Sequence, residues 1–478
     1  MSIPEVPRPA MPSTAATRTE HDELGPIEVP IDAPWGPQTQ RAIENFDISG
    51  VRMDRAIIRW IALVKLAAAT VSGHSPAVPE VDRAMADVIV RVAGEVAEGG
   101  WPDAFPVDVF QTGSGTSTNM NVNEVIARRA AALLGRPVHP NDHVNACQSS
   151  NDVVPTAIRL ATAEAVRDEL LPAIAELERV LLAAAVRFDD VVKPGRTHLM
   201  DAAPLFLGQE FEGYAGQIEF ARQILADCIG PLGQVPIGGS AVGTGLNVPD
   251  GWAGEVRNVL TDRTGLPVTA PANRFAVQHG EEVLADVSGR LRVLAGALTK
   301  ICNDLRLLNS GPHTGLGEIR LPAIQPGSSI MPGKVNPVIP EAVLQVAARV
   351  FGNDVTIGIA VANGTLELNT YLPVIGATLL ESVRLLTGAC RSLSGRCIEG
   401  ITADAVRSRQ LAEASPSMAA AASVEVGHEH VARAVRRSLE GGVTLRDALA
   451  AEGVTDDVLS RVLDPVRLAR GGRAIEGD

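Results

Sequence analysis

The 478-residue chain carries 42 Lys and Arg against 56 Asp and Glu, which gives a formal net charge of −14. This acidic balance excludes a general nucleic-acid binder, because binding a phosphate backbone depends on neutralising many phosphates. Hydrophobic residues make up 46% of the chain, so a large folded core is expected. The five cysteines form no CxxC pair, which favours reduced thiols in a cytoplasmic protein over a zinc or disulfide framework.

The first 148 residues predict a small N-terminal domain. Residues 1–20 are rich in Pro, Thr and Ala and lack the apolar core of a signal peptide, so a disordered tail is expected over about residues 1–18. The stretches MDRAIIRWIALVKLAAATV and VDRAMADVIVRVAGEVAEG carry apolar residues at three- and four-residue spacing, which predicts amphipathic helices. No uninterrupted apolar run is long enough to span a bilayer, so no membrane association is expected.

Residues 149–401 predict a central bundle of long helices. Five segments exceed the usual length of a globular helix, and their apolar residues cover more than one stripe, so each needs several neighbours. This favours a homo-oligomer of packed bundles over a large monomeric helical core. The fold class is therefore mainly all-α, with a small, charged helical C-terminal domain over residues 402–478. The five segments are Thr156–Phe188, Pro204–Ile229, Arg274–Asn309, Pro340–Asn363 and Asn369–Leu393.

Stretches of small polar residues interrupt this helical background. The first, Gln111–Asn123, offers hydroxyls, amides and backbone N–H groups, of which a simple turn would need only one or two. In the second, His139–Asp152, the residues Ser149, Ser150 and Asn151 precede the longest helical segment. Capping that helix needs one of the three. The surplus indicates a helix N-terminus that binds an anion, a carboxylate or a phosphate.

Two further polar stretches carry a histidine and a lysine. The segment Gly195–Asp201 holds His198 next to a threonine, an arginine and an aspartate. The segment Gly327–Pro337, GSSIMPGKVNP, resembles a phosphate-binding loop at first sight. Five residues separate its glycines where that loop has four, and Val335 follows the lysine where Ser or Thr is required. Pro332 also removes an N–H that the phosphate would need. A nucleotide site is therefore not expected here.

The combined inventory favours chemistry on a small dicarboxylate. It offers many neutral donors, a lysine, a histidine and a serine on a glycine-flanked loop, and it contains no metal-ligand cluster and no dinucleotide fingerprint. Removing a proton from the carbon beside a carboxylate builds up a doubly negative aci-carboxylate. Preorganised N–H, amide and ammonium donors stabilise such charge.

With these motifs assembled, the chain resembles the class II fumarases of the fumarase/aspartase superfamily. QTGSGT, HPND, QSSND, GRTHLMDA, AVGTGLN, GSSIMPGKVNP and ELN occur in the family's order, and the resemblance covers about residues 18–470. It implies a three-domain fold and a homotetramer with a twenty-helix core, in which each active site combines segments of three subunits. It also implies reversible hydration of fumarate to L-malate in the tricarboxylic acid cycle, without metal or organic cofactor.

The resemblance also implies a role for each matching residue. Ser328 would be the base that takes the C3 proton of malate, and Lys334 with Asn336 would hold the carboxylate that becomes the aci-form. His198, paired with Glu341, would orient the water and handle the proton at the leaving hydroxyl. The other substrate-binding residues would be Ser114, Thr116, Ser149, Ser150, Asn151 and Thr197. A second, noncatalytic dicarboxylate site would comprise Arg136, His139, Asn141 and Asp142.

Two alternatives to a fumarase remain at this stage. Aspartate ammonia-lyase performs the same elimination with ammonia, and KICNDLRLLNSGP, with Leu307, resembles aspartases at least as closely. QSSND and QTGSGT favour fumarase, and they weigh more because they lie at the site. A catalytically inactive relative is disfavoured, since all the expected catalytic residues are present. The segment ASVEVGHEH departs from the family pattern, which concerns the C-terminal domain more than the chemistry.

Overall fold

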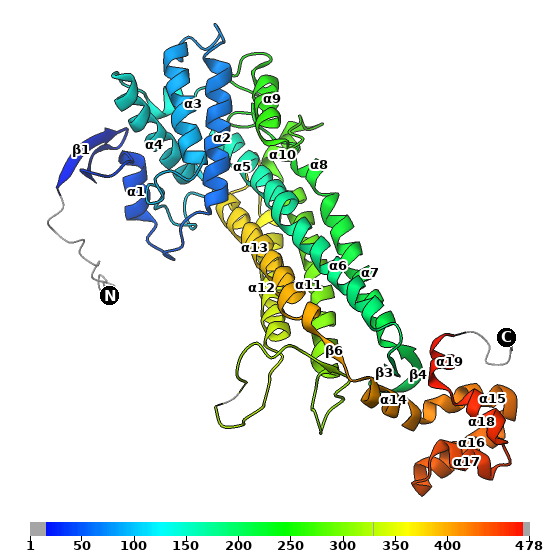
Figure 1. The fold of residues 1–478 in the computed structure, drawn as a ribbon. Helices are drawn as coiled ribbons and strands as arrows, with labels where there is room; N and C mark the ends of the chain where they lie inside the picture. Colours follow the sequence, from blue (N-terminus) through cyan, green and yellow to red (C-terminus); the bar gives the residue numbers. More distant parts are fainter. Residues whose placement is uncertain (1–15, 328, 472–478) are drawn as a thin grey trace, which may run out of the picture. The chain divides into compact units, whose positions relative to one another are not determined.

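The computed structural model describes residues 16–327 and 329–471 (Figure 1). Its internal contacts divide the chain into two compact units, each built from three separate stretches. Unit 1 comprises Met1–Asp168, Leu225–Gly289 and Gly352–Arg384. Unit 2 comprises Glu169–Ile224, Arg290–Phe351 and Leu385–Asp478. The three-domain division at residues 148 and 401 stays a prediction.

The chain is mainly helical, as expected, and its described strands form three antiparallel pairs. The pair β1 and β2 lies at the start of the described chain, and β1 begins inside the segment that we expected to be a loose tail. A strand there was not predicted because TRTEHD lacks apolar alternation. The segment is extended because it pairs in an antiparallel ladder with GPIEVP. The pairs are β1 (Thr17–Asp22) with β2 (Gly25–Pro30), β3 (Val192–Thr197) with β4 (Met200–Phe206), and β5 (Ile319–Arg320) with β6 (Thr402–Ala403).

Unit 1 is organised around α2 (Arg55–Ser72), which Asp54 caps by accepting a hydrogen bond from the Ala56 N–H at 2.9 Å. The helix carries apolar and small residues on nearly all sides, and most of its residues are buried. The helices that contact it are α3 (Arg83–Ala97), α4 (Thr116–Leu134), α5 (Ser150–Ala165) and α9 (Trp252–Thr264). Unit 1 also contains α1 (Pro37–Asn45), α8 (Ile229–Leu232) and α10 (Arg274–His279), with a π-helical turn at Pro140–Val144.

The long helices follow the predicted segments, with differences at their ends. A π-helical turn at Val166–Leu170 separates α5 from α6 (Leu171–Arg187), where Pro172 has no N–H to donate to the preceding turn. The predicted helix from Pro204 begins three residues later because Pro204 lies in β4. The predicted helix from Arg274 is broken between α10 and α11 at Gly280. The remaining long helices are α7 (Leu207–Ala226), α11 (Glu282–Leu308), α12 (Val338–Ala362) and α13 (Leu372–Arg396).

The segment Leu372–Gly400, which contains α13, is long and apolar enough by length and composition to cross a membrane. However, 61% of its most apolar window is buried, and Glu381, Arg384 and Arg391 interrupt the segment. These properties are those of a core helix in a folded chain, where neighbouring helices cover the apolar side chains.

The C-terminal part of unit 2 is a set of short helices around a small core. Alanine, valine and leucine side chains, including Ala422, Ala434 and Leu449, are buried there against one another. The helices are α14 (Ala405–Ala414), α15 (Ala419–Val426), α16 (His428–Gly441), α17 (Leu445–Ala451), α18 (Asp456–Val462) and α19 (Pro465–Ala469), with 3-10 turns at Ile398–Gly400 and Pro416–Met418. This agrees with the shorter helices expected after residue 401.

Candidate active site

The first polar stretch forms a tight turn at the N-terminus of α4 in unit 1. Gly115 has a left-handed φ of 75°, and a Cβ there would lie 2.8 Å from the Val154 side chain, so glycine is required. Ser114 is buried, and its Oγ lies 2.6 Å from the Thr116 Oγ1. The side-chain oxygen of Gln111 accepts hydrogen bonds from the Thr118 backbone N–H and hydroxyl, at 2.9 and 2.8 Å. The turn therefore holds two hydroxyls at one helix end.

The second polar stretch caps α5 as its sequence predicts. The Ser149 Oγ accepts a hydrogen bond from the Asn151 N–H at 3.2 Å, and the Asp152 carboxylate accepts one from the Ser149 N–H at 2.9 Å, which completes a capping box. One serine therefore serves as the cap. Ser150 and Asn151 remain at the N-terminus of the helix, where the dipole favours an anion.

Asp152 also ties this helix end to a distant loop. Its second carboxylate oxygen accepts hydrogen bonds from the Gly238 and Ser240 N–H groups at 3.0 and 2.9 Å, and the Asn151 side chain donates to the Ala241 carbonyl at 2.9 Å. Burial raises the pKa of Asp152 to about 6, although backbone donors act in the opposite direction. Sequence reasoning did not assign Asp152 a role, although the S-x-x-D spacing was a signal for its capping bond.

The structure brings the first two polar stretches together within unit 1. The Asn119 side-chain N–H donates to the Ser150 Oγ at 3.0 Å, and both residues are buried. Asn119 belongs to the first stretch and Ser150 to the second. A hydrogen bond therefore joins the two segments at Ser150, whereas Ser114 and Thr116 form a separate hydrogen-bonded pair.

The third polar stretch is the tip of a β-hairpin in unit 2. Thr197 pairs with Met200, and the two residues between them, His198 and Leu199, have φ of 56° and 61°. Such backbone suits a tight hairpin turn but is uncommon for these residue types. The sequence placed His198 directly before a helix, whereas β4 intervenes. Both Thr197 and His198 are exposed at the tip.

A buried ion-pair cluster anchors the base of this hairpin. The Arg196 guanidinium donates to both oxygens of Glu318, at 2.7 and 3.1 Å. Lys193, which is 1% exposed, donates to Glu210 at 2.7 Å and lies 3.4 Å from Glu318. Two cations and two carboxylates therefore balance one another beneath the exposed histidine.

The fourth polar stretch is a loop whose two ends lie against each other in unit 2. The Asn336 side chain donates to the Gly327 carbonyl at 3.0 Å, and a Cβ on Gly327 would lie 2.0 Å from the Lys334 carbonyl oxygen. Lys334 is exposed, whereas Glu341 is half-buried in the first turn of α12. Ser328, the expected base, lies outside the described residues. Among the described residues of this chain, His198 and Glu341 share no hydrogen bond or ion pair.

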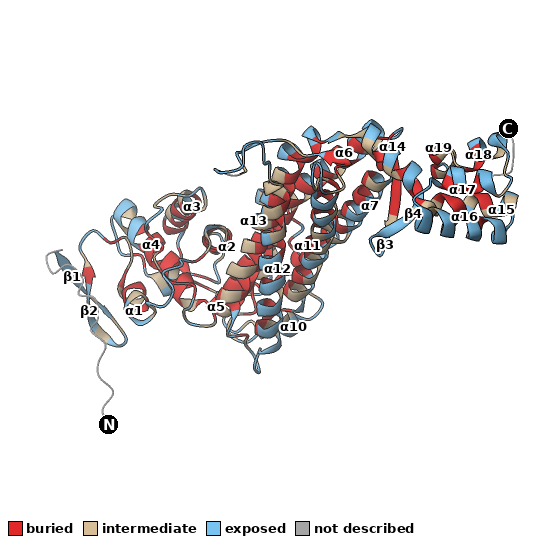
Figure 2. Cartoon of the chain, turned by 90° about the horizontal axis from the view of Figure 1, so that it is seen from below, coloured by how far each residue is buried: buried red, intermediate tan, exposed pale blue. Residues whose placement is uncertain are grey.

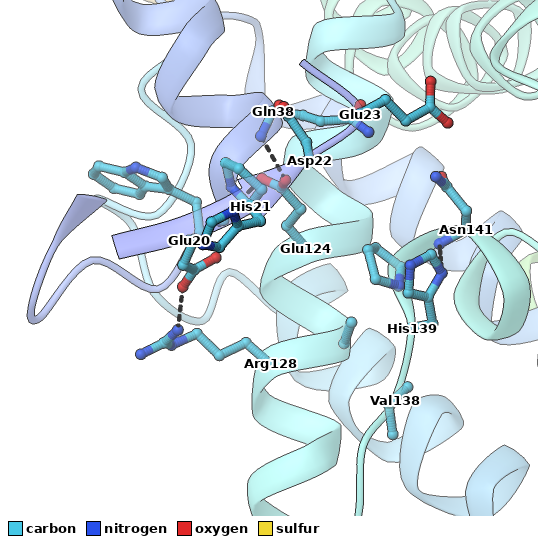
Figure 3. A pocket seen from close by; sticks show the side chains of 15 residues that line it. Glu20, His21, Asp22, Glu23, Gln38, Glu124, Arg128, Val138, His139 and Asn141 are labelled. Atoms are coloured by element: carbon cyan, nitrogen blue, oxygen red, sulfur yellow. Dashed lines mark hydrogen bonds and ion pairs between the residues drawn. The ribbon is translucent and has the colours of Figure 1, made fainter. Parts of the chain in front are cut away.

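The four residues expected to form a second dicarboxylate site follow the C-terminus of α4. The His139 Nδ1 accepts hydrogen bonds from the Asn141 and Asp142 N–H groups at 3.3 and 3.1 Å, and Arg136 is paired with Asp82. Figure 3 shows His139 and Asn141 at the wall of a cavity of about 640 Å³. The opposite wall carries Glu20, Asp22, Glu23 and Glu124. Their charge opposes a bound anion in this cavity, so the second site stays a prediction.

Comparisons with known proteins show the family to which this chain belongs. A family model described as a lyase matches residues 25–352. Class II fumarate hydratase of Mycobacterium tuberculosis strain H37Rv is 49% identical over 96% of this chain and 97% of its own, and that of Pseudomonas syringae pv. tomato is 46% identical over 95% and 99%. The crystal structure of class II fumarase from Schistosoma mansoni matches with a TM-score of 0.92 and 34% identity, over 95% of this chain and 99% of that one. The chain therefore belongs to the class II fumarate hydratases, within the lyase family.

Proposed function

We propose that this chain catalyses the reversible anti addition of water to fumarate, which gives L-malate, as a step of the tricarboxylic acid cycle. The observation that carries the proposal is the cluster at the N-terminus of α5, where Ser150 and Asn151 remain after Ser149 has capped the helix. The names of the relatives favour water over ammonia as the second reactant. The aspartate ammonia-lyase alternative is accordingly not favoured.

The substrate dicarboxylate meets neutral donors in unit 1. The helix N-terminus, the Ser150 hydroxyl and the Asn151 amide bind one carboxylate, while the Ser114 and Thr116 hydroxyls add donors from α4. Thr197 joins them from the hairpin. Neutral donors suit a small dianion because they satisfy its oxygens without a fixed counter-charge on the protein.

The chemistry uses the groups of unit 2. In the dehydration direction Ser328 takes the C3 proton of malate, and the electron pair of that C–H bond moves into the adjacent carboxylate to form the aci-carboxylate. Lys334 and Asn336 stabilise this charge. The pair then forms the double bond as the C2 hydroxyl leaves with a proton delivered by His198, which Glu341 orients. Hydration of fumarate follows the same path in reverse.

The active unit is a homotetramer. Phe351, Val355 and Ile359 are 40%, 62% and 59% exposed and recur at four-residue spacing along α12, so they form one apolar stripe on a long helix. Figure 2 shows that α12 carries exposed residues along its length. Packing against other copies covers this stripe. Assembly also lets His198 of one copy meet Glu341 of another. Light scattering should therefore give four times the chain mass of 50.1 kDa, and a monomer would contradict this.

We place the enzyme in the cytoplasm, since its five cysteines are all free thiols.

The second, noncatalytic dicarboxylate site would form only if Arg136 leaves its ion pair with Asp82. Its residues would be Arg136, His139, Asn141 and Asp142. A dicarboxylate titration of the Arg136→Ala variant tests this, because loss of one of two binding events is expected.

The reaction is tested by incubating the purified protein with fumarate, with and without ammonium, and following malate and aspartate by chromatography. Malate should form at the same rate in both samples. Aspartate without malate would contradict the hydratase, and neither product would leave the chain without the proposed activity.

A further inference from the structure

Lys65 is a buried lysine in unit 1 to which the proposed chemistry gives no role. It lies within α2 and is 0% exposed. Its Nζ donates hydrogen bonds to the side-chain oxygens of Asn145 at 2.6 Å and Gln148 at 3.1 Å. Both acceptors lie in the short segment that leads into Ser149. The lysine therefore contacts two side chains of the turn that precedes the proposed substrate-binding residues.

The hydrogen bonds of Lys65 fix the orientation of two neighbouring amides. An ammonium or amine head donates to both of these partners, so the oxygen of Asn145 must face it. The Asn145 NH₂ group then donates to the backbone carbonyl of Gln148 at 3.2 Å. Because Asn145 presents an oxygen, the Asn119 side chain must turn its NH₂ group toward it, at 3.3 Å. The hydrogen bonds of Lys65 thus determine which end of the Asn145 amide, and in turn of the Asn119 amide, donates and which accepts.

The hydrogen bond from Asn119 determines whether the Ser150 hydroxyl can donate to a bound ligand. The Asn119 NH₂ group also donates to the Ser150 Oγ at 3.0 Å. A serine hydroxyl that accepts from the protein keeps its own hydrogen for another acceptor. That acceptor is the substrate carboxylate. With Asn119 reversed, its oxygen would take the serine hydrogen, and the donor to substrate would be lost.

The turn held by Lys65 is also conformationally demanding. Cys147 has a left-handed φ of 62°, which is uncommon for a residue with a side chain. The Gln148 amide holds the turn from inside, donating to the Val144 and Ala146 carbonyls at 3.2 and 3.0 Å, while its oxygen accepts from Lys65. Lys65 therefore adds the hydrogen bond that holds the oxygen of the Gln148 amide, while the two carbonyls hold its NH₂ group.

We propose that Lys65 is a positioning residue for substrate binding: through Asn145 and Asn119 it makes Ser150 a hydrogen-bond donor to the dicarboxylate, and through Gln148 it fixes the turn before Ser149. The proposal rests on the assignment of Ser150 to substrate binding. Since Lys65 acts equally on the ground state and the transition state, its loss should affect substrate affinity more than turnover.

The first test is the Lys65→Met variant, assayed as the full oligomer after circular dichroism and light scattering have established that it folds and assembles. We expect KM for fumarate and the inhibition constant of succinate, a non-reacting dicarboxylate, each to rise about tenfold, the effect of roughly one lost hydrogen bond. The kcat should change less than threefold. If both constants stay within twofold of wild type in an active, folded variant, the proposal is wrong.

A matched pair at Asn145 tests the chain of bonds without removing the lysine. Asn145→Asp keeps an oxygen for Lys65 and Asn119 to donate to, whereas Asn145→Leu has a similar size and no acceptor. The aspartate variant should keep KM within about threefold. The leucine variant should raise KM by more than that and by no more than Lys65→Met, which also loses the bond to Gln148. Equal effects of the two substitutions would overturn the relay.

The double variant Lys65→Met/Asn145→Leu should raise KM no further than Lys65→Met alone, because Lys65→Met already removes the bond from Lys65 to Asn145. Multiplicative effects would show that the two residues act separately. Wild type serves as the reference in every assay. A wild-type protein without malate formation would refute the proposed function itself, whereas an active wild type with unaffected variants would refute only the role of Lys65.

Discussion

The two units hold their functional groups in different ways. In unit 1, Ser114, Ser150 and Asp152 are buried. Ser150 accepts a hydrogen bond from Asn119 of α4, and Asp152 accepts one from the Gly238 N–H. In unit 2, His198 and Lys334 lie exposed on a hairpin tip and a loop. The comparison indicates that the residues proposed to bind substrate are held inside the folded chain, whereas the residues proposed for acid–base chemistry lie on exposed segments.

The same contrast appears in the two buried lysines. Lys193 in unit 2 has carboxylate partners, Glu210 and Glu318, so its cluster balances charge and anchors the hairpin. Lys65 in unit 1 donates to neutral amides. Burial lowers the pKa of Lys65 to about 7, and the charge of Asp152 opposes that shift. The neutral partners of Lys65 do not balance its charge. Its hydrogen bonds instead fix the orientation of the Asn145 and Gln148 side-chain amides.

The largest expected effect is a loss of turnover without a loss of stability. Ser328→Ala should lower kcat about 10³-fold or more, because removing the base eliminates proton abstraction. The midpoint of thermal unfolding and the oligomeric mass should not change. The measurements are steady-state kinetics and calorimetry of the same preparation. Near-normal turnover would remove Ser328 from the role of base.

The second effect concerns the anchor of the hairpin. Glu318→Ala leaves Lys193 and Arg196 without their shared carboxylate, and unpaired buried charge costs about 3–5 kcal/mol of unfolding free energy. Glu399→Ala is the control, because Glu399 and its partner Arg179 are 52% and 61% exposed and such pairs contribute at most about 1 kcal/mol. Urea unfolding measures both. Similar losses in the two variants would contradict a structural anchor at Glu318.

Sequence reasoning found the local features of the site and missed those that depend on distant contacts. The surplus of polar residues at Ser149–Asn151 was readable because capping is a local rule. The turn at His198 was not, since neither His nor Leu signals positive φ. Lys65 sits in an apolar stretch where its burial depends on helices far away in sequence. The break before α11 likewise depends on Gly280, one glycine within a continuous helical pattern.

A third, smaller effect compares two glycines at opposite ends of α4. Gly115 and Gly135 have nearly equal φ, 75° and 73°, but only Gly115 would place a Cβ against Val154. Gly135→Ala should cost about 1–2 kcal/mol of unfolding free energy from backbone strain alone. Gly115→Ala should cost more and also raise KM, because Ser114 and Thr116 move. Equal stability losses and an unchanged KM would show that the turn tolerates the extra carbon.

A fourth effect is a pH dependence of stability that belongs to Lys65. Its folded-state pKa of about 7 lies below its ordinary value of 10.5, so the unfolded chain binds more protons between these values. Stability of the wild type relative to Lys65→Met should therefore rise with pH across this window, by up to about 1.4 kcal/mol per unit. Urea unfolding at pH 7.5 and 9 measures the difference. A constant difference would mean that Lys65 keeps its charge when buried.

The most direct measurement mixes two inactive variants in one oligomer. Asn151→Ala damages the binding cluster of unit 1, and His198→Asn damages the hairpin of unit 2. Co-expression with two different affinity tags yields oligomers that contain both. If different copies supply the binding cluster and the hairpin, some sites in a mixed oligomer combine two intact segments. Malate formation should then recover to a substantial fraction of the wild-type rate. Mixed oligomers as inactive as their parents would contradict a site shared between copies.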